Sequence, residues 1–480
     1  MLIKKIKNHF LFGFLILSFL LSATAVQAQE EINKFGIHIL EPNELAAAAK
    51  LVNSQGGDWG FVTIVIRDDD LDFKKWQDFF DQCRRLHLIP LVRLATHIEN
   101  NSWRAPEEKE AKMWADFLDR LNWPVKKRYL ILFNEPNHAK EWGGKVAPDQ
   151  YGRIVNAFAK ELKKKNENFF LLPAGLDLAA NNSRETMDAF LFLKKAHQAN
   201  PEIFNQLDGW ASHSYPNHGF VGKPTDTGRT SIRGYQWELS VLKRYFGLKK
   251  DLPVFITETG WPHQEPKNNP PASGKRAKNN FYDPKTTAQY IEKAYENVWL
   301  PDKRVVAVTP FTLNYHTPPL DNFSWLDKDG HPYPQYETIK EIPKKSWWPE
   351  QETSWQVVSI KIPQFLPINS QYQGKIKLKN TGQSIWGEKS FLIKPLSSTT
   401  PWLELPPGKL IFPGQSYEFS FNIATSPFPQ TFNLSWEKIG NFSITAFNPA
   451  SIKSYNKNAF QKILSLIKVW WYDKKRQWLK

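Results

Sequence analysis

The feature that most constrains this chain is a repeat of short apolar runs between residues 30 and 345. Each run is followed by a segment with helical spacing. The runs lie at residues 35–40, 60–66, 88–95, 129–136, 169–175, 209–216, 253–261 and 305–313. They are almost continuously apolar, which is typical of parallel strands buried on both faces. Eight strands that alternate with helices predict an α/β fold, a (β/α)8 TIM barrel.

A second region follows a Pro- and Trp-rich linker at residues 346–354. From 355 to 448 the helical patterns disappear. Short runs of alternating apolar and polar residues take their place, separated by turn residues every 8 to 12 positions or so. This region predicts a small all-β sandwich.

The N-terminus has the pattern of an export signal. Lys4, Lys5 and Lys7 precede an apolar run that ends in small residues at Ala28. This predicts a signal peptide over 1–28, cleaved after Ala28. An uncleaved anchor is the alternative, but the run is short for a spanning helix, which favours cleavage. We therefore expect a secreted or cell-surface protein.

The C-terminal tail, residues 449–480, is strongly basic. It carries eight Lys and Arg against a single Asp, in a chain of formal net charge +15. Its apolar residues recur at helical spacing, as in an amphipathic helix. For an exported chain, nucleic acid is not an expected partner, whereas an anionic cell-envelope surface is. The alternative is that the apolar stripe packs on the protein itself.

Cysteine and aromatic content narrow the chemistry further. Cys83 is the only cysteine, so no intrachain disulfide is expected, and its helical context predicts a buried apolar residue. The ligand spacing of a metal site is not found, and neither a metal nor an organic cofactor is predicted. Aromatic residues make up 14% of the chain, with 20 Trp. Such a surplus serves either as sugar-stacking surfaces or as core filler.

Polar residues at strand ends are the candidate site, because the carboxyl ends of parallel barrel strands converge on one face. Glu135 lies at the end of the fourth run and Glu258 at the end of the seventh predicted strand. These strands stand on opposite sides of a narrow mouth, so we expect the two carboxylates to face each other. The other candidates at strand ends are Asn134, His213, Tyr215, Arg93, His97 and His38.

The ordered set of motifs resembles a known clan. Asn-Glu-Pro after the fourth strand, Thr-Glu-Thr-Gly-Trp-Pro at the seventh and His-x-Tyr at the sixth are similar to the retaining TIM-barrel glycoside hydrolases. That clan includes the cellulase-like family 5 and the β-xylosidase-like family 39. The resemblance implies Glu258 as nucleophile, Glu135 as acid/base and Asn134 as a hydrogen-bonding partner of the sugar 2-hydroxyl group.

The same resemblance implies supporting roles. Tyr215 is expected to donate a hydrogen bond to Glu258. Arg93 is expected to be a cationic neighbour of that carboxylate, with Arg67 as the competing candidate. His213 belongs to the His-x-Tyr motif, whereas His38 and His97 are candidates from their strand-end positions; each is expected to contact substrate, or else to be an ordinary core histidine.

One departure from the clan concerns the stacking surface for the sugar. The clan commonly places a Trp on the eighth strand, and this chain has Phe311 there. Trp261, Trp142 and Trp325 are the other predicted platforms. The loop after Trp261 ends where Asp283 is expected to cap a helix that starts at Pro284. Within this loop, four basic residues could meet acidic glycans or be simply solvated: Lys267, Lys275, Arg276 and Lys278.

The second region resembles the immunoglobulin-like four-tryptophan domain found on some secreted bacterial enzymes. Trp386 and Trp436 are expected in its core. A spacer or docking role is favoured over sugar binding.

These observations together predict a retaining glycoside hydrolase, an O-glycosyl hydrolase acting on an oligo- or polysaccharide. A transglycosylase would use the same two glutamates. A catalytically silent carbohydrate-binding envelope protein is the alternative from another class. The glycan and its linkage are left open.

Overall fold

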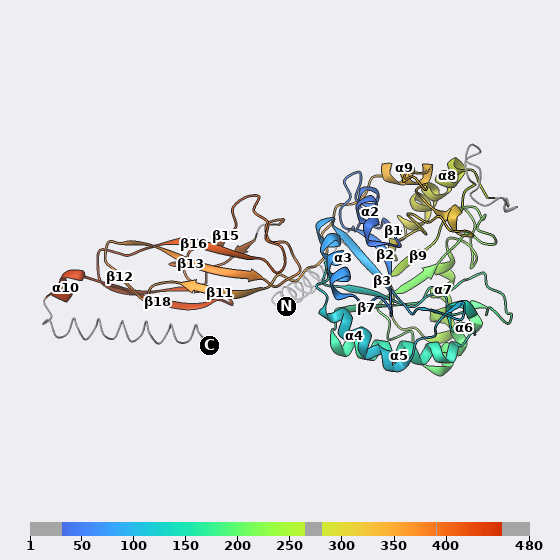
Figure 1. The fold of residues 1–480 in the computed structure, drawn as a ribbon, viewed down its shortest axis with the longest axis horizontal. Coiled ribbons are helices and arrows are strands. Elements are labelled where there is room, and N and C mark those ends of the chain that lie inside the picture. Colours follow the sequence, from blue (N-terminus) through green and yellow to red (C-terminus); the bar gives the residue numbers. More distant parts are fainter. Residues whose placement is uncertain (1–30, 265–280, 390, 454–480) are drawn as a thin grey trace, which may run out of the picture. The chain divides into compact units, whose positions relative to one another are not determined.

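The computed structural model describes residues 31–264, 281–389 and 391–453 (Figure 1). The predicted signal peptide, the four basic residues of the loop after Trp261 and most of the basic tail lie outside these ranges. The chain divides into two compact units. Among the described residues, helices with the length and apolar character to cross a membrane are not found.

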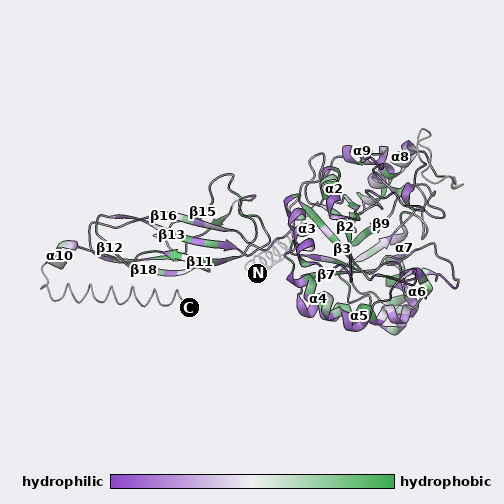
Figure 2. Cartoon of the chain, viewed as in Figure 1, coloured by the Kyte–Doolittle hydropathy of each residue, from purple (hydrophilic) through white to green (hydrophobic). Residues whose placement is uncertain are grey.

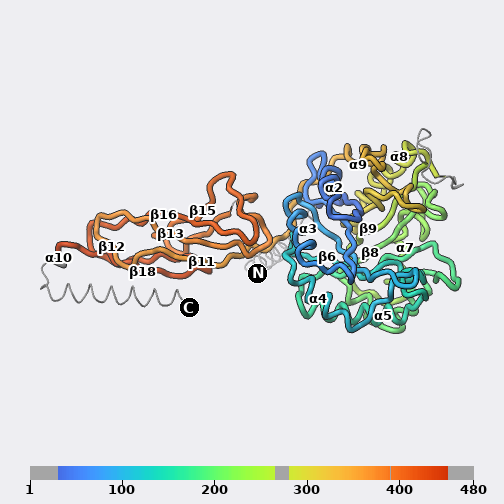
Figure 3. Tube along the Cα trace, in the orientation of Figure 1, coloured from blue at the N-terminus to red at the C-terminus, as the bar shows by residue number. Residues whose placement is uncertain are grey.

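The first unit comprises the described parts of Met1–Thr63, Trp210–Arg244 and Lys250–Trp348. Its strands are β1 (Gly36–His38), β8 (Trp210–His213), β9 (Val254–Glu258) and β10 (Val305–Val308). β8 pairs with β9 and β9 with β10, all in parallel, and Phe35 forms a parallel bridge to Val308. Its helices are α2 (Leu45–Val52), most of α7 (Gly234–Phe246), α8 (Pro284–Ala294) and α9 (Pro334–Glu341). Helix α9 lies beside α2, and the Tyr336 hydroxyl donates to the Ala47 carbonyl oxygen (Figure 3).

The second unit comprises the described parts of Ile64–Gly209, Tyr245–Lys249 and Pro349–Lys480. Strand β2 (Gly60–Arg67) enters it, followed by β3 (Leu88–Ala95), β6 (Arg128–Leu132) and β7 (Phe169–Pro173). The helices between them are α3 (Phe73–Arg85), α4 (Ala111–Arg120), α5 (Pro148–Lys165) and α6 (Ala189–Ala199). A short hairpin, β4 (Ile98–Glu99) with β5 (Ser102–Trp103), follows β3 and was not predicted from the sequence.

The strand pairings form one order. The first sheet runs β1-β2-β3-β6-β7 and the second β10-β9-β8, and the Phe35–Val308 bridge lies between β1 and β10. Each of the eight predicted apolar runs overlaps one of these eight strands. The predicted α/β class with a parallel sheet is confirmed, and the strand order is the one expected of a (β/α)8 barrel.

Local sequence explains these elements. Every side chain of β6 and β9 is buried, as expected for strands covered on both faces. Helices α4 and α5 carry hydrophilic residues on their outer sides (Figure 2). Asp283 accepts hydrogen bonds from the first turn of α8, and Pro284 is its first residue, as predicted. Cys83 is buried in α3, which confirms the expected apolar environment.

The C-terminal part of the second unit is all-β. One sheet has the order β11 (Trp355–Lys361), β13 (Gln371–Asn380), β16 (Ser416–Ala424), and the other β12 (Phe365–Pro367), β18 (Gly440–Phe447), β17 (Gln430–Trp436). A small pair, β14 (Leu392–Ile393) and β15 (Leu403–Glu404), and a short helix, α10 (Pro449–Lys453), complete it. Trp386 and Trp436 are both in the shared apolar core of these strands.

Strand ends differ from the sequence prediction at the positions that matter most. β6 ends at Leu132, so Glu135 stands in the loop three residues beyond the strand. β8 ends at His213, so Tyr215 also lies past its strand. The predicted runs are therefore longer than the strands, because their last residues have already left the hydrogen-bonded ladder.

Candidate active site

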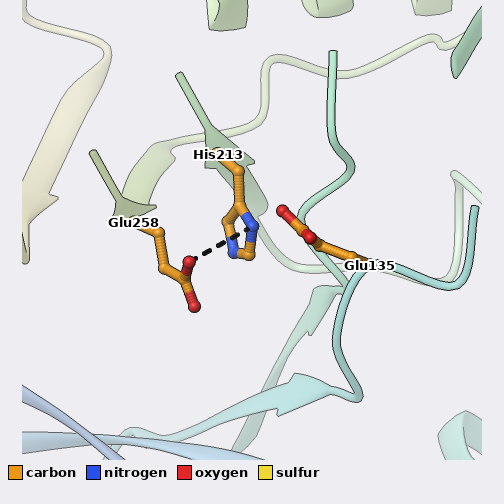
Figure 4. A group of neighbouring side chains, drawn as sticks. All are labelled: Glu135, His213 and Glu258. Carbon is orange, nitrogen blue, oxygen red and sulfur yellow. Dashed lines mark ion pairs between the residues drawn. The ribbon is translucent and has the colours of Figure 1, made fainter. Parts of the chain in front are cut away.

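Three side chains from the ends of β6, β8 and β9 meet in one group. Single ligand atoms of Glu135, His213 and Glu258 all lie within 4.8 Å of one another (Figure 4). Two are carboxylate oxygens from glutamates that are far apart in the sequence. Two carboxyl groups this close can act on a single bound atom between them.

The loop that carries Glu135 has a constrained backbone. Phe133 and Glu135 both have positive φ, at 75° and 31°. Non-glycine residues in this region each cost about 1–3 kcal/mol, so the surrounding structure must hold them there. Here the Glu135 backbone N–H donates to the Gly175 carbonyl oxygen at 3.1 Å. The side-chain Nδ2 of buried Asn137 donates to the carbonyl oxygens of Asp177, at 2.9 Å, and Met187, at 3.1 Å. These bonds tie the loop after β6 to the loop after β7.

Glu258 is held by partners within the first unit. It is the last residue of β9 and is 9% exposed. The Tyr215 hydroxyl donates to its Oε2 atom at 3.1 Å, and Nδ1 of His213 lies 3.8 Å from the same oxygen (Figure 4). A hydrogen-bond donor aimed at a carboxylate oxygen stabilises the ionised form.

Asn134 is engaged on both sides of its amide. Its Oδ1 accepts from Nη1 of Arg93 at 2.8 Å, and its Nδ2 donates to Oε2 of Glu141 at 3.0 Å. Arg93 is thus seen bonded to Asn134, whereas the competing Arg67 forms an exposed ion pair with Asp69. Sequence reasoning missed Glu141, whose carboxylate accepts this bond from Asn134. It ends a short 3-10 helix, Ala139–Glu141, where no sequence pattern marks a site.

His138, three residues after Glu135, belongs to the same loop. Its Nε2 lies 2.9 Å from Oδ2 of Asp177. The hydrogen bond with Asp177 raises the pKa of His138; burial opposes this, and the charge of Glu135 adds to it. Sequence reasoning also missed Asp177, because the sequence does not show that the loop after β7 lies beside His138.

The predicted Trp platforms are wrong for this structure. Trp142 is 0% exposed, packed against Phe133 and Tyr151, and Trp261 is 3% exposed with its N–H donating to the Gly222 carbonyl oxygen at 2.7 Å. Trp325 is buried as well. A sugar needs an open ring face to stack on, and these rings are buried.

Phe311 differs from the three tryptophans. It is partly exposed, and its backbone N–H donates to the Thr259 carbonyl oxygen, one residue after Glu258. Phe323 and Tyr315 pack beside its ring. It is thus placed next to the Glu258 turn with part of its ring open.

The two other predicted histidines, His38 and His97, differ in exposure. His38 is 0% exposed, and its ring centre lies 5.2 Å from that of Phe311. Of the two alternatives left open for His38, this position matches the core histidine and not the contact to substrate. His97 is partly exposed, with Nδ1 3.0 Å from Oδ1 of Asp68.

Metal ligation is the other chemistry open to these donors. Glu135, His213 and Glu258 have the composition of a divalent-cation site. An exposed group of Asp327, Asp329 and His331 has it too, but the Asp327 carboxylate already accepts from two backbone N–H groups of its own turn. That second group is accounted for as a local turn.

No protein-family model and no curated protein matches this chain. Similar solved structures include a monomeric β-xylosidase from Caulobacter crescentus CB15, with 14% identity, 65% of this chain and 68% of that chain covered, and a TM-score of 0.43. A glucosidase from Croceicoccus marinus has 10% identity, 82% and 94% coverage, and a TM-score of 0.47. A β-mannanase from Thermomonospora fusca has 13% identity, 66% and 90% coverage, and a TM-score of 0.39. These neighbours are glycoside hydrolases, but at such low similarity the function of this chain has to be argued from its own site.

Proposed function

We propose that this protein is a retaining glycoside hydrolase that cleaves an oligo- or polysaccharide through Glu135 and Glu258. The observation that carries the proposal is the approach of their carboxylate oxygens to within 4.8 Å. Retaining enzymes hold their two carboxyl groups about 5–5.5 Å apart, whereas inverting enzymes need about 6.5–9.5 Å to admit a water molecule. The approach of one oxygen of each glutamate to within 4.8 Å supports the retaining arrangement.

The surroundings of the two glutamates support different roles. The Tyr215 hydroxyl donates a hydrogen bond to Glu258, which favours a negatively charged nucleophile. Glu135 stands on a loop and is partly exposed, so it can exchange protons with solvent. We therefore assign Glu258 as nucleophile and Glu135 as acid/base.

The reaction would run in two displacements. The Glu258 carboxylate attacks the anomeric carbon and forms a C–O bond, while the bond to the leaving oxygen breaks and Glu135 gives that oxygen its proton. Water then attacks the same carbon, Glu135 takes the proton of the water, and the bond to Glu258 breaks. His138, whose pKa is raised by its hydrogen bond to Asp177 and by the charge of Glu135, lies on the same loop as Glu135.

The binding surface around this pair is proposed in the same way. Phe311 would stack on the sugar, and Asn134, positioned by Arg93 and Glu141, would hydrogen-bond the 2-hydroxyl group. A chromogenic glycoside panel together with polysaccharides would identify the glycan.

Two variants and one product analysis test the assignment. Glu258→Gln should abolish turnover, because an amide cannot act as the nucleophile, and Glu167→Gln, the same change at an exposed position, should not. Proton NMR of the first-formed product should show the substrate's anomeric configuration. A product of inverted configuration, or full activity of Glu258→Gln, would refute the proposal.

The same assay separates the alternatives. A transglycosylase would give lengthened products when an acceptor sugar is added, and would lose them in Glu258→Gln. A silent binding protein would bind glycans in calorimetry and turn over none of the panel.

The remaining organisation is also proposed. The chain would be exported by residues 1–28, and 355–448 would be an immunoglobulin-like spacer or docking domain. Deletion of 449–480 should lower binding to anionic liposomes and leave turnover of soluble substrate unchanged, if the basic tail meets the envelope. Equal liposome binding would reject that partner.

A further inference from the structure

Glu238 is a carboxylic acid in a place where the sequence pattern calls for an apolar residue. It shares the inward face of α7 with Tyr235 and Leu242, at helical spacing, and is 0% exposed. Burial of a carboxyl group is costly unless the group is hydrogen-bonded. Burial raises the pKa of Glu238 to about 7, opposed by hydrogen bonds from Ser212 and Trp210 and by the charge of His213. A residue this costly needs a reason.

The bonds of Glu238 form a directed chain. The backbone N–H of Tyr235 donates to Oγ of Ser214 at 3.0 Å, and the two serine hydroxyls are 2.8 Å apart. The Ser212 hydroxyl then donates to Oε2 of Glu238. The Ser212 hydroxyl has one hydrogen and gives it to Glu238, so it must accept from the Ser214 hydroxyl, and the direction of both hydroxyl groups is set.

This chain lies directly behind the residues that hold the nucleophile. Ser212 and Ser214 alternate with His213 and Tyr215, both of which approach Oε2 of Glu258. The Thr259 hydroxyl, next to Glu258, donates to the Ser214 carbonyl oxygen at 2.7 Å. Ser214 is thus tied both to α7 and to the end of β9.

We propose that Glu238 is a positioning residue, whose hydrogen bond to Ser212 fixes the segment that aims His213 and Tyr215 at Glu258. The inference rests on the proposed function, since it concerns the alignment of that nucleophile. Glu238 itself is buried behind the strand and does not touch substrate. It acts through Ser212 and Ser214, and its loss leaves two buried hydroxyl groups without a fixed direction.

The test compares two replacements with a matched control. Glu238→Leu keeps the approximate size and removes the acceptor, whereas Glu238→Gln keeps a carbonyl oxygen that can accept from Ser212. Glu44→Leu is the control: Glu44 is also a buried carboxyl with pKa raised to about 7 by burial, but it accepts from the backbone N–H groups of Leu40 and Glu41. All three are assayed as the full chain for kcat, KM and melting temperature.

Glu238→Leu should lower kcat ~10- to 100-fold with KM little changed, because small misplacements of a reacting group cost that much. Glu238→Gln should recover most of kcat. Glu44→Leu should lower the melting temperature and leave kcat alone.

An unchanged kcat in a folded Glu238→Leu variant, with the wild type active, would overturn this inference alone. A fall in kcat for Glu238→Leu that Glu238→Gln does not reverse would overturn it as well, since the acceptor would then not be the cause. Absence of wild-type turnover on every glycoside would instead overturn the proposed function, and this inference with it.

Discussion

Replacement of Tyr215 by Phe removes one oxygen atom from the neighbourhood of Glu258. That oxygen donates to Oε2 at 3.1 Å, and the acceptor is a carboxylate with little access to water. A hydrogen bond to a charged group contributes about 1.5–3 kcal/mol. With tenfold in rate per about 1.4 kcal/mol, the loss predicts a fall in kcat/KM of roughly 10- to 150-fold for Tyr215→Phe.

The fold should tolerate this change. The Tyr215 ring packs edge-on against Phe220 and Phe323, with ring centres 5.1 and 5.9 Å away, and Phe keeps that ring. The expected loss of folding stability is therefore that of the hydrogen bond to the charged group alone, about 1.5–3 kcal/mol. Steady-state kinetics on an aryl glycoside, together with thermal unfolding, measures both quantities on the same preparation.

Tyr336→Phe is the matched control. Its hydroxyl donates to the Ala47 carbonyl oxygen, also at 3.1 Å, between α9 and α2. Because its acceptor is neutral, Tyr336→Phe should cost about 0.5–1.5 kcal/mol of stability, and it should leave kcat/KM unchanged. If Tyr215→Phe kept wild-type kcat/KM, the hydrogen bond would not support the nucleophile, and the assignment of Glu258 to that role would lose its main electrostatic argument.

Three further outcomes are expected. Asp177→Asn removes the ionised partner of His138, so the imidazole should titrate at lower pH in NMR. A raised pKa in the folded state contributes stability that is lost as the pH rises through that pKa. The wild type should therefore lose the contribution of this pair on going to alkaline pH, and the variant should not. Dialysis against EDTA should leave turnover unchanged if the carboxylate pair acts without a metal, and restoration of lost activity by a divalent cation would contradict that. Gly387→Ala should destabilise the all-β part by several kcal/mol, because a Cβ at φ +101° would clash with the Lys409 carbonyl oxygen, whereas Gly408→Ala, with φ +74° and an open surrounding, should cost only ~1–2 kcal/mol in chemical denaturation.

The sequence predicted structure best where the feature depends only on neighbouring residues along the chain. Apolar runs located all eight strands, because strands buried on both faces need continuous apolar residues. Asp283 and Pro284 marked the start of α8, because capping depends only on the first turn. The two glutamates were singled out because polar residues at the ends of buried strands have few structural reasons to be there.

Local rules could not predict which side chains are exposed to solvent or which residues distant in the sequence contact each other. The sequence cannot tell an open Trp from a covered one, and Trp142, Trp261 and Trp325 are covered by other segments. Likewise, Glu141 and Asp177 acquire meaning only beside Asn134 and His138. Glu238 is the exception that did leave a signal, as a charged residue on the apolar face of a helix.

The sequence by itself determined the class of fold, the order of its strands and the positions of two acids at strand ends, since these follow from spacing along the chain. Only the tertiary structure decided the separation of those acids and the partners that distinguish them. The reason is physical: a distance of a few ångströms between residues more than a hundred positions apart depends on how loops bend and pack, as the backbone of Glu135 shows, and neighbouring residues alone do not set it.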